Sequence, residues 1–454
     1  MSLNYSFAQA VEETVPPPIP KAWAWRDQYL LDPIEGPVVD LSQGFPGTAP
    51  HESVLTALSE AAKQGPVAKY GAILGSPALR EAVAEEMRVL YRMKRPVNGL
   101  ASGPGVTAPD VAITAGGNMA FLVTLMALCP PNASSVLLPM PNYFSHAMTL
   151  SLQSVMPIHL ACDPEDNFYP SLPAARAYLE SAGNDAGNKV KPRMILLINP
   201  SNPTGSIMGP ELLKEWYELA REYKVALVVD ETYRDFVEGE TEDLRGVPHK
   251  LFEEADWRST FISLGSFSKS YRIPGYRLGT ITGSPMLLRR LETICDCVQI
   301  CAPQVAQVAL PPLLPSLRPD LLTASHALAH RRALFREIIS TVPGWKIESS
   351  GGYFAYVSFP SEYLSASSSL GLKRKRLGSE DVAKGLAVKA GVVVLPGNFS
   401  MPDLEDDEVW EGVVGGQKLR EDRWLRFAVA NVDDETIKKV GPRLRRFNEI
   451  MGMS

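Results

Sequence analysis

The chain has few cysteines, no long apolar run and no excess of positive charge. Its 454 residues include 5 cysteines, and 45 basic residues stand against 51 acidic ones, which gives a net charge of −6. Cysteines this sparse do not build a disulfide framework in a long chain. A membrane span needs about 20 consecutive apolar residues, and a nucleic-acid partner needs a basic surface. We therefore expect neither membrane nor nucleic-acid partners, and the lack of a secretion signal predicts a cytoplasmic location.

Two clusters of metal-ligand residue types occur in the sequence. Three cysteines fall in the segment CDCVQIC, residues 295–301, and two histidines, His326 and His330, are four residues apart. Both clusters lie in helical patterns, and no second group of ligands is close in sequence. We expect buried thiols and a packed or solvated histidine pair, and therefore no metal site.

The overall composition predicts a large core, because 45% of the residues are hydrophobic and 21% are charged. A chain of this length favours two or more domains. Residues 1–36 are rich in proline and aromatic residues, which predicts an arm that lies across another part of the protein or across a partner subunit. The basic run from Lys373 to Arg376 has the charge of a nuclear signal, but we expect a solvated loop insertion at 364–379.

One lysine, Lys269, stands in an unusual setting. It lies in a turn of small and hydroxyl residues between two strand-like apolar runs, residues 260–265 and 277–282. A lysine at the end of a strand can be desolvated, and desolvation favours the neutral amine. A neutral amine forms a Schiff base with a carbonyl compound, as in enzymes that use pyridoxal 5'-phosphate (PLP). The alternative is a surface turn with a solvated lysine.

Several groups suited to a phosphate occur near this turn or after a glycine loop. Serine hydroxyls and an arginine flank the lysine, and a guanidinium can bind phosphate through two hydrogen bonds. The glycine loop follows the apolar strand 111–114 and opens a helix, whose N-terminus attracts anions. Tight strand-to-helix turns also use glycine without any ligand. The candidate phosphate ligands are Ser266, Ser268, Arg277, Gly116, Gly117 and Asn118.

Two further polar residues follow apolar strands. Asp230 comes after five apolar residues, and a carboxylate at the end of a buried strand needs a cationic partner, for which a protonated pyridine nitrogen is suitable. Tyr143 comes just past the strand 135–140, where open parallel sheets bind ligands, and its ring can stack on a flat heterocycle. The alternatives are a helix cap or surface acid for Asp230 and a core tyrosine for Tyr143.

A rigid turn and an arginine in an apolar strand are the last candidate site features in the sequence. The apolar run 194–198 ends in Asn-Pro-Ser-Asn-Pro-Thr-Gly, a turn that fixes the side chain of Asn202 at the edge of the sheet. Near the end of the chain an arginine enters the otherwise apolar strand RWLRFAVANV, residues 423–432. A buried arginine needs a carboxylate, and both Arg426 and Arg423 are candidates.

These segments resemble class I/II aminotransferases, which are PLP enzymes of fold type I. The resemblance rests on S-x-S-K before an arginine eight positions later, on Asn-Pro-Thr-Gly at Asn202, on D-x-x-Y at Asp230, and on Y-x-x-x-x-G-x-x-x-L-R at Tyr70. The motifs stand in family order and extend from about residue 38 to 432. The resemblance implies an α/β fold, with a three-layer α/β/α large domain around a mostly parallel sheet and a smaller α+β domain.

The resemblance also implies domain boundaries and residue roles. It predicts an arm at 1–36, a small domain from 37–65 and 335–454, and a large domain at 66–334. Lys269 would form the Schiff base with PLP and then act as the base. The remaining roles are as follows: Asn202 and Tyr233 contact the ring oxygen, Asp230 the pyridine nitrogen, and Tyr143 the ring face, while Arg426 binds the substrate carboxylate under the turn at Gly44.

The implied activity is the transfer of an amino group between an L-amino acid and a 2-oxo acid. Tyr70 would reach the cofactor phosphate of a neighbouring subunit, which predicts a homodimer. Phe45, Tyr143 and Tyr353 point to an aromatic or apolar substrate. A β-lyase or an enzyme like 1-aminocyclopropane-1-carboxylate synthase would use the same site and stays open as an alternative. A non-enzymatic PLP-binding module would need a DNA-binding domain ahead of Val38, where the sequence shows only the arm.

Overall fold

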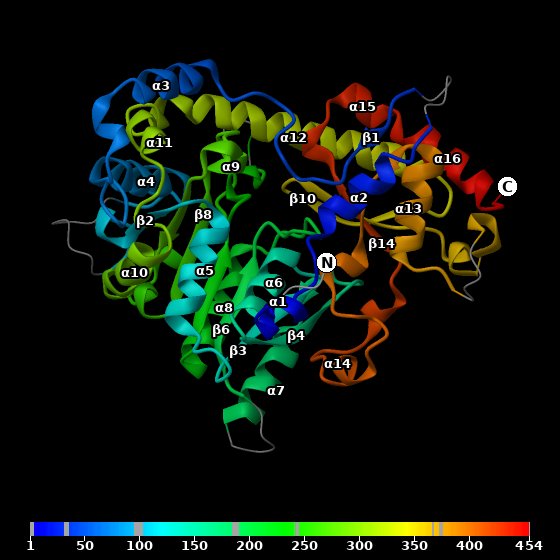
Figure 1. Cartoon of the computed structure of the whole chain (residues 1–454), viewed down its shortest axis with the longest axis horizontal. Coiled ribbons are helices and arrows are strands. Elements are labelled where there is room, and N and C mark those ends of the chain that lie inside the picture. The colour runs from blue at the N-terminus through cyan, green and yellow to red at the C-terminus, as the bar shows by residue number, and fades with distance from the viewer. Residues whose placement is uncertain are drawn as a thin grey trace.

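The structure is a computed structural model that describes residues 4–30, 36–94, 103–183, 190–239, 241, 245–365, 367–371 and 376–453. The basic residues 373–375 and the middle of the expected insertion lie outside the described residues. Two lobes are visible in Figure 1, one around an eight-stranded sheet and one around a four-stranded sheet. We call them the large lobe and the small lobe.

The large lobe is built on a sheet with the strand order β2-β9-β8-β7-β6-β3-β4-β5. Its strands are β2 (Val111–Thr114), β3 (Ser135–Met140), β4 (Met156–Asp163), β5 (Tyr169–Pro170), β6 (Pro192–Ile198), β7 (Ala226–Asp230), β8 (Phe261–Ser266) and β9 (Gly279–Thr282). The strands from β8 to β4 pair in parallel, whereas β9 pairs antiparallel with both β2 and β8, and β5 pairs antiparallel with β4. Continuous apolar strands are expected in a sheet that is covered on both faces.

Helices cover both faces of this sheet, as the alternation of its side chains requires. Within β6, Ile195 and Leu197 join one core cluster, whereas Met194 and Leu196 join another. Helices α4, α7 and α8 contribute to the first cluster and helices α5, α6 and α10 to the second. The helices are α4 (Pro77–Leu90), α5 (Gly117–Leu128), α6 (Phe144–Leu152), α7 (Leu172–Gly183), α8 (Pro210–Tyr223) and α10 (Pro285–Val298). This is the predicted three-layer α/β/α arrangement.

The small lobe contains an antiparallel sheet with helices packed on it. The strand order is β10-β11-β14-β13, and β1 pairs with β12 beside it. Its strands are β1 (Val39–Asp40), β10 (Lys346–Gly351), β11 (Phe354–Ser358), β12 (Val392–Val393), β13 (Leu395–Pro396) and β14 (Trp424–Ala428). Its helices are α13 (Ser379–Ala390), α15 (Asp434–Lys438) and α16 (Val440–Ile450). The predicted fold class, α/β with a smaller α+β unit, is confirmed.

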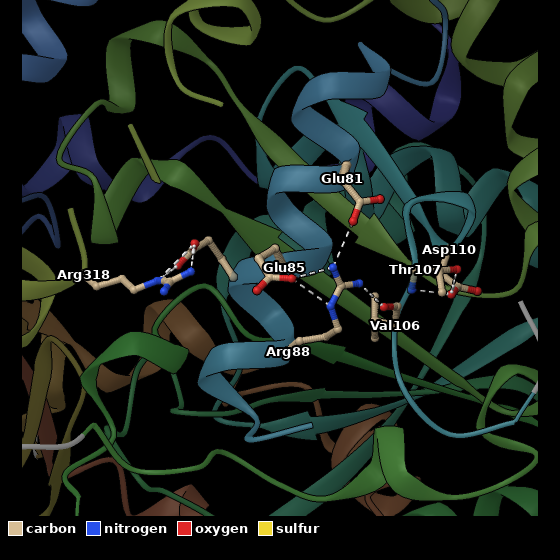
Figure 2. A network of polar contacts seen from close by, with 8 residues as sticks. Glu81, Glu85, Arg88, Val106, Thr107, Asp110 and Arg318 are labelled. Atoms are coloured by element: carbon tan, nitrogen blue, oxygen red, sulfur yellow. Dashed lines mark hydrogen bonds and ion pairs between the residues drawn. The ribbon is translucent and has the colours of Figure 1, made fainter. Parts of the chain in front are cut away.

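One long helix joins the lobes. Helix α12 (Arg318–Ser340) crosses the top of the molecule in Figure 1. At its start, the guanidinium of Arg318 binds Glu86 of α4 at 2.7 Å. On the neighbouring turn of α4, the buried Arg88 donates to Glu85 at 2.7 Å and to the carbonyl of Val106 at 2.7 Å, as Figure 2 shows. The pair of Arg318 and Glu86 fastens the first turn of α12 to α4, and the contacts of Arg88 fix α4 to the segment before β2.

The N-terminal arm lies across both lobes of its own chain. Helix α1 (Gln9–Glu13) contacts α6, and the hydroxyl of Thr14 donates to that of Ser151 at 2.8 Å. Helix α2 (Pro18–Arg26) packs beside α13 of the small lobe, where Lys21 pairs with Glu380 at 2.7 Å. The arm therefore bridges the two lobes on the face seen in Figure 1.

The predicted domain boundaries remain predictions. Helix α3 (Glu52–Ala62) packs against α11 (Gln304–Ala309), and its residues Val54 and Leu58 join the core of the large lobe.

Within the described part of the chain, no helix is both long and apolar enough to cross a membrane.

Candidate active site

A pocket opens between the lobes at the carboxyl ends of the parallel strands, where α/β sheets bind ligands. Its volume is about 960 Å³ including the open mouth, within the usual range for small-molecule sites. The predicted site residues that line it are Gly44, Gly117, Asn118, Tyr143, Asn202, Asp230, Tyr233, Ser266, Ser268, Lys269, Arg277 and Arg426. The structure thus brings together residues that lie far apart in the sequence.

Lys269 lies in the one-turn helix α9 (Phe267–Ser270), directly after β8. The hydroxyl of Ser266 caps this turn by accepting a hydrogen bond from the backbone of Ser268 at 3.2 Å. The Lys269 amine donates to the carbonyl of Gly44. Burial, together with the positive charges of Arg426 and Arg277, lowers the pKa of Lys269 to about 8. A lysine with this pKa supplies neutral amine close to neutral pH.

The anion end of the pocket is formed by a helix N-terminus and a guanidinium. Helix α5 begins at Gly117, and Gly116 before it has a φ of 91°, a conformation that favours glycine. A Cβ at position 116 would lie 2.3 Å from the Nη2 of Arg277, so only glycine lets the arginine approach the loop. Arg277 is also held by the carbonyl of Pro274 at 2.9 Å. Together with the hydroxyls of Ser266 and Ser268, these groups suit a phosphate.

Asp230 ends β7 and faces the same pocket. Its Oδ1 accepts hydrogen bonds from the backbone and the hydroxyl of Thr232, at 3.0 and 2.7 Å, and its Oδ2 lies 3.3 Å from the Nε2 of His146. Burial would raise the pKa of this carboxyl, but His146 and Thr232 outweigh burial and hold the pKa below its usual range. The carboxylate is therefore ionised and can face a cation.

His146 and Thr232, which hold this carboxylate, were not predicted from the sequence. His146 lies on the first turn of α6, three residues after Tyr143, and its ring packs 4.4 Å from the ring of Phe121. The i,i+3 spacing places His146 and Tyr143 on one side of the helix start, which was a usable signal. Thr232 follows Asp230 by two residues, a spacing typical of a local side-chain-to-backbone turn.

Arg426 is the arginine that enters the pocket. Its Nη1 donates to the Oδ1 of Asn202 at 2.9 Å, and its guanidinium lies 4.7 Å from the ring centre of Phe354. Burial lowers its pKa to about 10, and its Nε has no hydrogen-bond partner among the described residues. Arg423 instead donates to the carbonyl of Phe359 at 3.1 Å, outside the pocket. Arg426 is therefore the candidate for a substrate carboxylate.

Two tyrosines border the pocket near Asp230. Tyr143 immediately precedes α6, and its ring meets that of His146 edge to face at 5.2 Å. Tyr233 meets the ring of Phe354 edge to face at 5.3 Å. Burial raises the pKa of both phenols, so both remain protonated and can donate a hydrogen bond.

Tyr70 does not lie in the pocket of its own chain. Its side chain is 80% exposed, and the backbone of the next residue, Gly71, donates to the sulfur of Cys301 at 3.4 Å. The role predicted for Tyr70 requires a second copy of the chain and stays a prediction.

The pocket also contains residues that the sequence did not single out. They are Ile19, Gln43, Phe144, Ile198, Thr232, Pro274 and Phe354. Ile19 belongs to α2 of the arm, and no local pattern connects it with residues of β11 or α6. Its place follows from tertiary packing alone.

The donors and acceptors along the pocket fit PLP. Anion ligands at one end suit the phosphate, the ionised Asp230 suits a protonated ring nitrogen, and Asn202 with Tyr233 supplies donors for a ring oxygen. The amine of Lys269, with its pKa lowered to about 8, faces the same space. The close approach of Arg277 to Gly116 shows that the anion end is built without room for a side chain on the loop.

Comparison with known proteins shows the family to which the chain belongs. Residues 36–444 match the family described as aminotransferase class I and II. An aspartate aminotransferase of Sulfurisphaera tokodaii is 24% identical over 382 residues, which cover 84% of this chain and 83% of that protein. The aromatic aminotransferase ISS1 of Arabidopsis thaliana is 27% identical over 366 residues, covering 79% and 81%. Substrate-bound BacF from Bacillus subtilis shares the fold, with a TM-score of 0.76 at 19% identity and 98% coverage of both chains.

Proposed function

The chain belongs to the class I and II aminotransferases and is a PLP-dependent transaminase, and from this premise we propose which residues carry the reaction and which amino acids it accepts. The reaction moves an amino group between an amino acid and a 2-oxo acid. The proposed donors are L-amino acids with apolar or aromatic side chains.

The proposed cofactor ligands follow from the geometry of the pocket. Bound PLP supplies an aldehyde carbon and a ring that withdraws electrons from the substrate Cα. Asp230, kept ionised by His146, would hold a proton on the ring nitrogen by accepting its hydrogen bond. Tyr143 would lie on the ring face, and Asn202 and Tyr233 would donate to the ring oxygen. The proposed phosphate ligands are Gly116, Gly117, Asn118, Ser266, Ser268 and Arg277.

Lys269 is the proposed point of covalent attachment and the proposed general base. Once its amine is free, the lowered pKa of about 8 lets the Nζ atom accept the Cα proton of the substrate and release it again. Arg426, braced by Asn202, would bind the substrate carboxylate through its fork of N–H groups. With the carboxylate fixed under Gly44, the Cα proton is held within reach of the amine.

The proposed substrate class rests on the side chains that line the pocket. Ile19, Phe144 and Phe354 present apolar surface to it. Among the described residues that line the pocket, the cations are Lys269, Arg277 and Arg426, and each already has a proposed task. No lining cation is left for a second carboxylate, so apolar and aromatic amino acids are favoured over aspartate and glutamate.

Of the three aromatic residues predicted to mark an aromatic substrate, only Tyr143 lines this pocket in the described structure. Phe45 is 42% exposed. Tyr353 borders the neighbouring cavity behind Lys269. The apolar preference therefore rests on Ile19, Phe144 and Phe354 rather than on Phe45 or Tyr353.

We also propose a cytoplasmic homodimer. The exposed Tyr70 supports the dimer, because a phenol 80% exposed on one chain is free to reach the phosphate end of another chain's pocket. All five cysteines are free thiols, which supports a reducing compartment.

The test is a panel of amino acids given to the PLP-loaded enzyme with a common 2-oxo acid acceptor. We expect kcat/KM for phenylalanine or leucine to exceed that for aspartate by about 100-fold or more, because an unpaired buried charge costs about 3 kcal/mol or more. Ile19→Lys should narrow this gap by adding a cation at the wall, whereas the matched control Ile19→Val should leave it unchanged. A wild-type preference for aspartate or glutamate would contradict the proposed substrate class.

A further inference from the structure

The turn that carries Lys269 is too short to fix its own position. Helix α9 has only 4 residues, Phe267–Ser270, whereas isolated helices need about 12 residues or more to be stable. The direction of the Lys269 side chain therefore depends on contacts that come from outside the turn.

Two of these contacts come from the large lobe. The hydroxyl of Ser270 donates to Asp235 at 2.5 Å. Arg272 closes the turn with a φ of 57°, a left-handed conformation that is costly for arginine, and its guanidinium pairs with Asp320 of α12. These side-chain contacts hold the residues after Lys269, and the backbone N–H of Arg272 also donates to the carbonyl of Lys269 at 3.3 Å.

The contacts that reach Lys269 from outside the turn come from the opposite side. Tyr353, in the turn between β10 and β11 of the small lobe, donates its phenolic hydrogen to the backbone carbonyl of Lys269 at 3.1 Å. The lysine amine lies 5.9 Å from the ring centre of Tyr353 and donates to the carbonyl of Gly44. Gly44 contacts the small lobe, since a Cβ there would meet the ring of Phe354.

Tyr353 itself is firmly held. It is 3% exposed, and its ring packs against Phe236 at 4.9 Å and Tyr233 at 5.1 Å. Burial raises the pKa of its phenol, so the group stays protonated and donates the hydrogen bond across the pH range of enzyme assays.

We infer that Tyr353 is a positioning residue that ties Lys269 to the small lobe and so places the amine for proton transfer. The inference rests on the proposed role of Lys269. Without the phenolic hydroxyl, the turn keeps its large-lobe contacts and the hydrogen bond from the amine to Gly44, but its backbone loses the direct bond to the small lobe. The amine is then held less firmly and becomes more hydrated. Substrate binding through Arg426 is untouched by this change, so the step that moves the proton should suffer and the binding step should not.

The test compares Tyr353→Phe with a matched control, Tyr363→Phe, in the full-length PLP-loaded enzyme. Tyr363 is also a buried tyrosine of the small lobe, and its hydroxyl bonds Asn448 instead of the lysine turn. Loss of one neutral hydrogen bond predicts that kcat of Tyr353→Phe falls about 3- to 10-fold while KM stays within about twofold. Tyr363→Phe should lower the melting temperature but leave kcat unchanged.

A second readout does not depend on turnover. In the full-length protein before PLP is added, labelling of Lys269 by trinitrobenzenesulfonate is followed against pH by mass spectrometry of its peptide. The wild-type midpoint should lie near pH 8, and Tyr353→Phe should shift it upward because a more hydrated amine holds its proton better. Unchanged kcat and midpoint in Tyr353→Phe, or equal changes in Tyr363→Phe, would overturn the inference. Turnover by Lys269→Ala would instead overturn the role of Lys269.

Discussion

The buried amine of Lys269 should weaken the folded protein when no cofactor is bound. The site lowers the pKa of this lysine from 10.5 to about 8. A shift of this size corresponds to roughly 3 kcal/mol, because the charged amine is more costly in the folded than in the unfolded chain. Lys269→Met keeps the length of the side chain and removes the charge. We predict that this variant is more stable than the wild type at pH 7 by roughly 2 kcal/mol, after loss of the hydrogen bond to Gly44.

The sign of the pH dependence follows from the two pKa values. Below about pH 8 the lysine is charged in both states, so the full penalty is present. Between about pH 8 and 10.5 the unfolded chain holds more protons than the folded one, so wild-type stability rises with pH. The advantage of Lys269→Met should therefore shrink as pH rises through this range.

Urea unfolding of the cofactor-free protein at several pH values measures this difference. The control is Lys63→Met, because the Lys63 side chain is 66% exposed and pairs with the nearby, similarly exposed Glu60. This control should change stability by less than about 0.5 kcal/mol without pH dependence. If Lys269→Met were less stable than the wild type at every pH, burial of the amine would not be the cause of its lowered pKa.

Three further predictions concern other parts of the site. His146→Asn removes a group that keeps the pKa of Asp230 low, so the acid limb of the kcat–pH profile should move to higher pH. Asp230→Asn should lower kcat at least about 100-fold at all pH values. Arg426→Lys should raise KM for the amino acid about 10-fold or more in steady-state assays, because lysine lacks the fork that binds a carboxylate. Gly116→Ala should weaken PLP affinity, measured by fluorescence titration, since a Cβ would meet Arg277 at 2.3 Å. The matched glycine control is Gly65→Ala, where a Cβ would meet no atom within 4 Å.

The sequence predicted the site well where each residue directly follows a strand. Asp230, Asn202 and Lys269 all come after apolar runs, and parallel strands end at one edge of a sheet, so their side chains had to meet. The alternating clusters on β6 likewise follow from a sheet covered on both faces. Local sequence patterns therefore predicted both the layered fold and the residues at the centre of the pocket.

The sequence failed where position depends on packing between distant segments. Ile19 reaches the pocket because the arm crosses from α6 to α13, which no local pattern encodes. Which of Arg426 and Arg423 enters the pocket depends on strand register. Arg426 lies inside β14, opposite Tyr356 of β11, whereas Arg423 precedes β14. The link from Tyr353 to Lys269 likewise requires the lobes to be in place.

The most direct test of the account is a single half-reaction. The PLP-loaded enzyme receives phenylalanine without any 2-oxo acid, and phenylpyruvate is counted while the cofactor absorbance is followed. We predict one phenylpyruvate per bound PLP, a lasting absorbance change that an added 2-oxo acid reverses, and neither event in Lys269→Ala. Product that accumulates over many turnovers without an acceptor, or an equal yield from Lys269→Ala, would contradict transamination through Lys269.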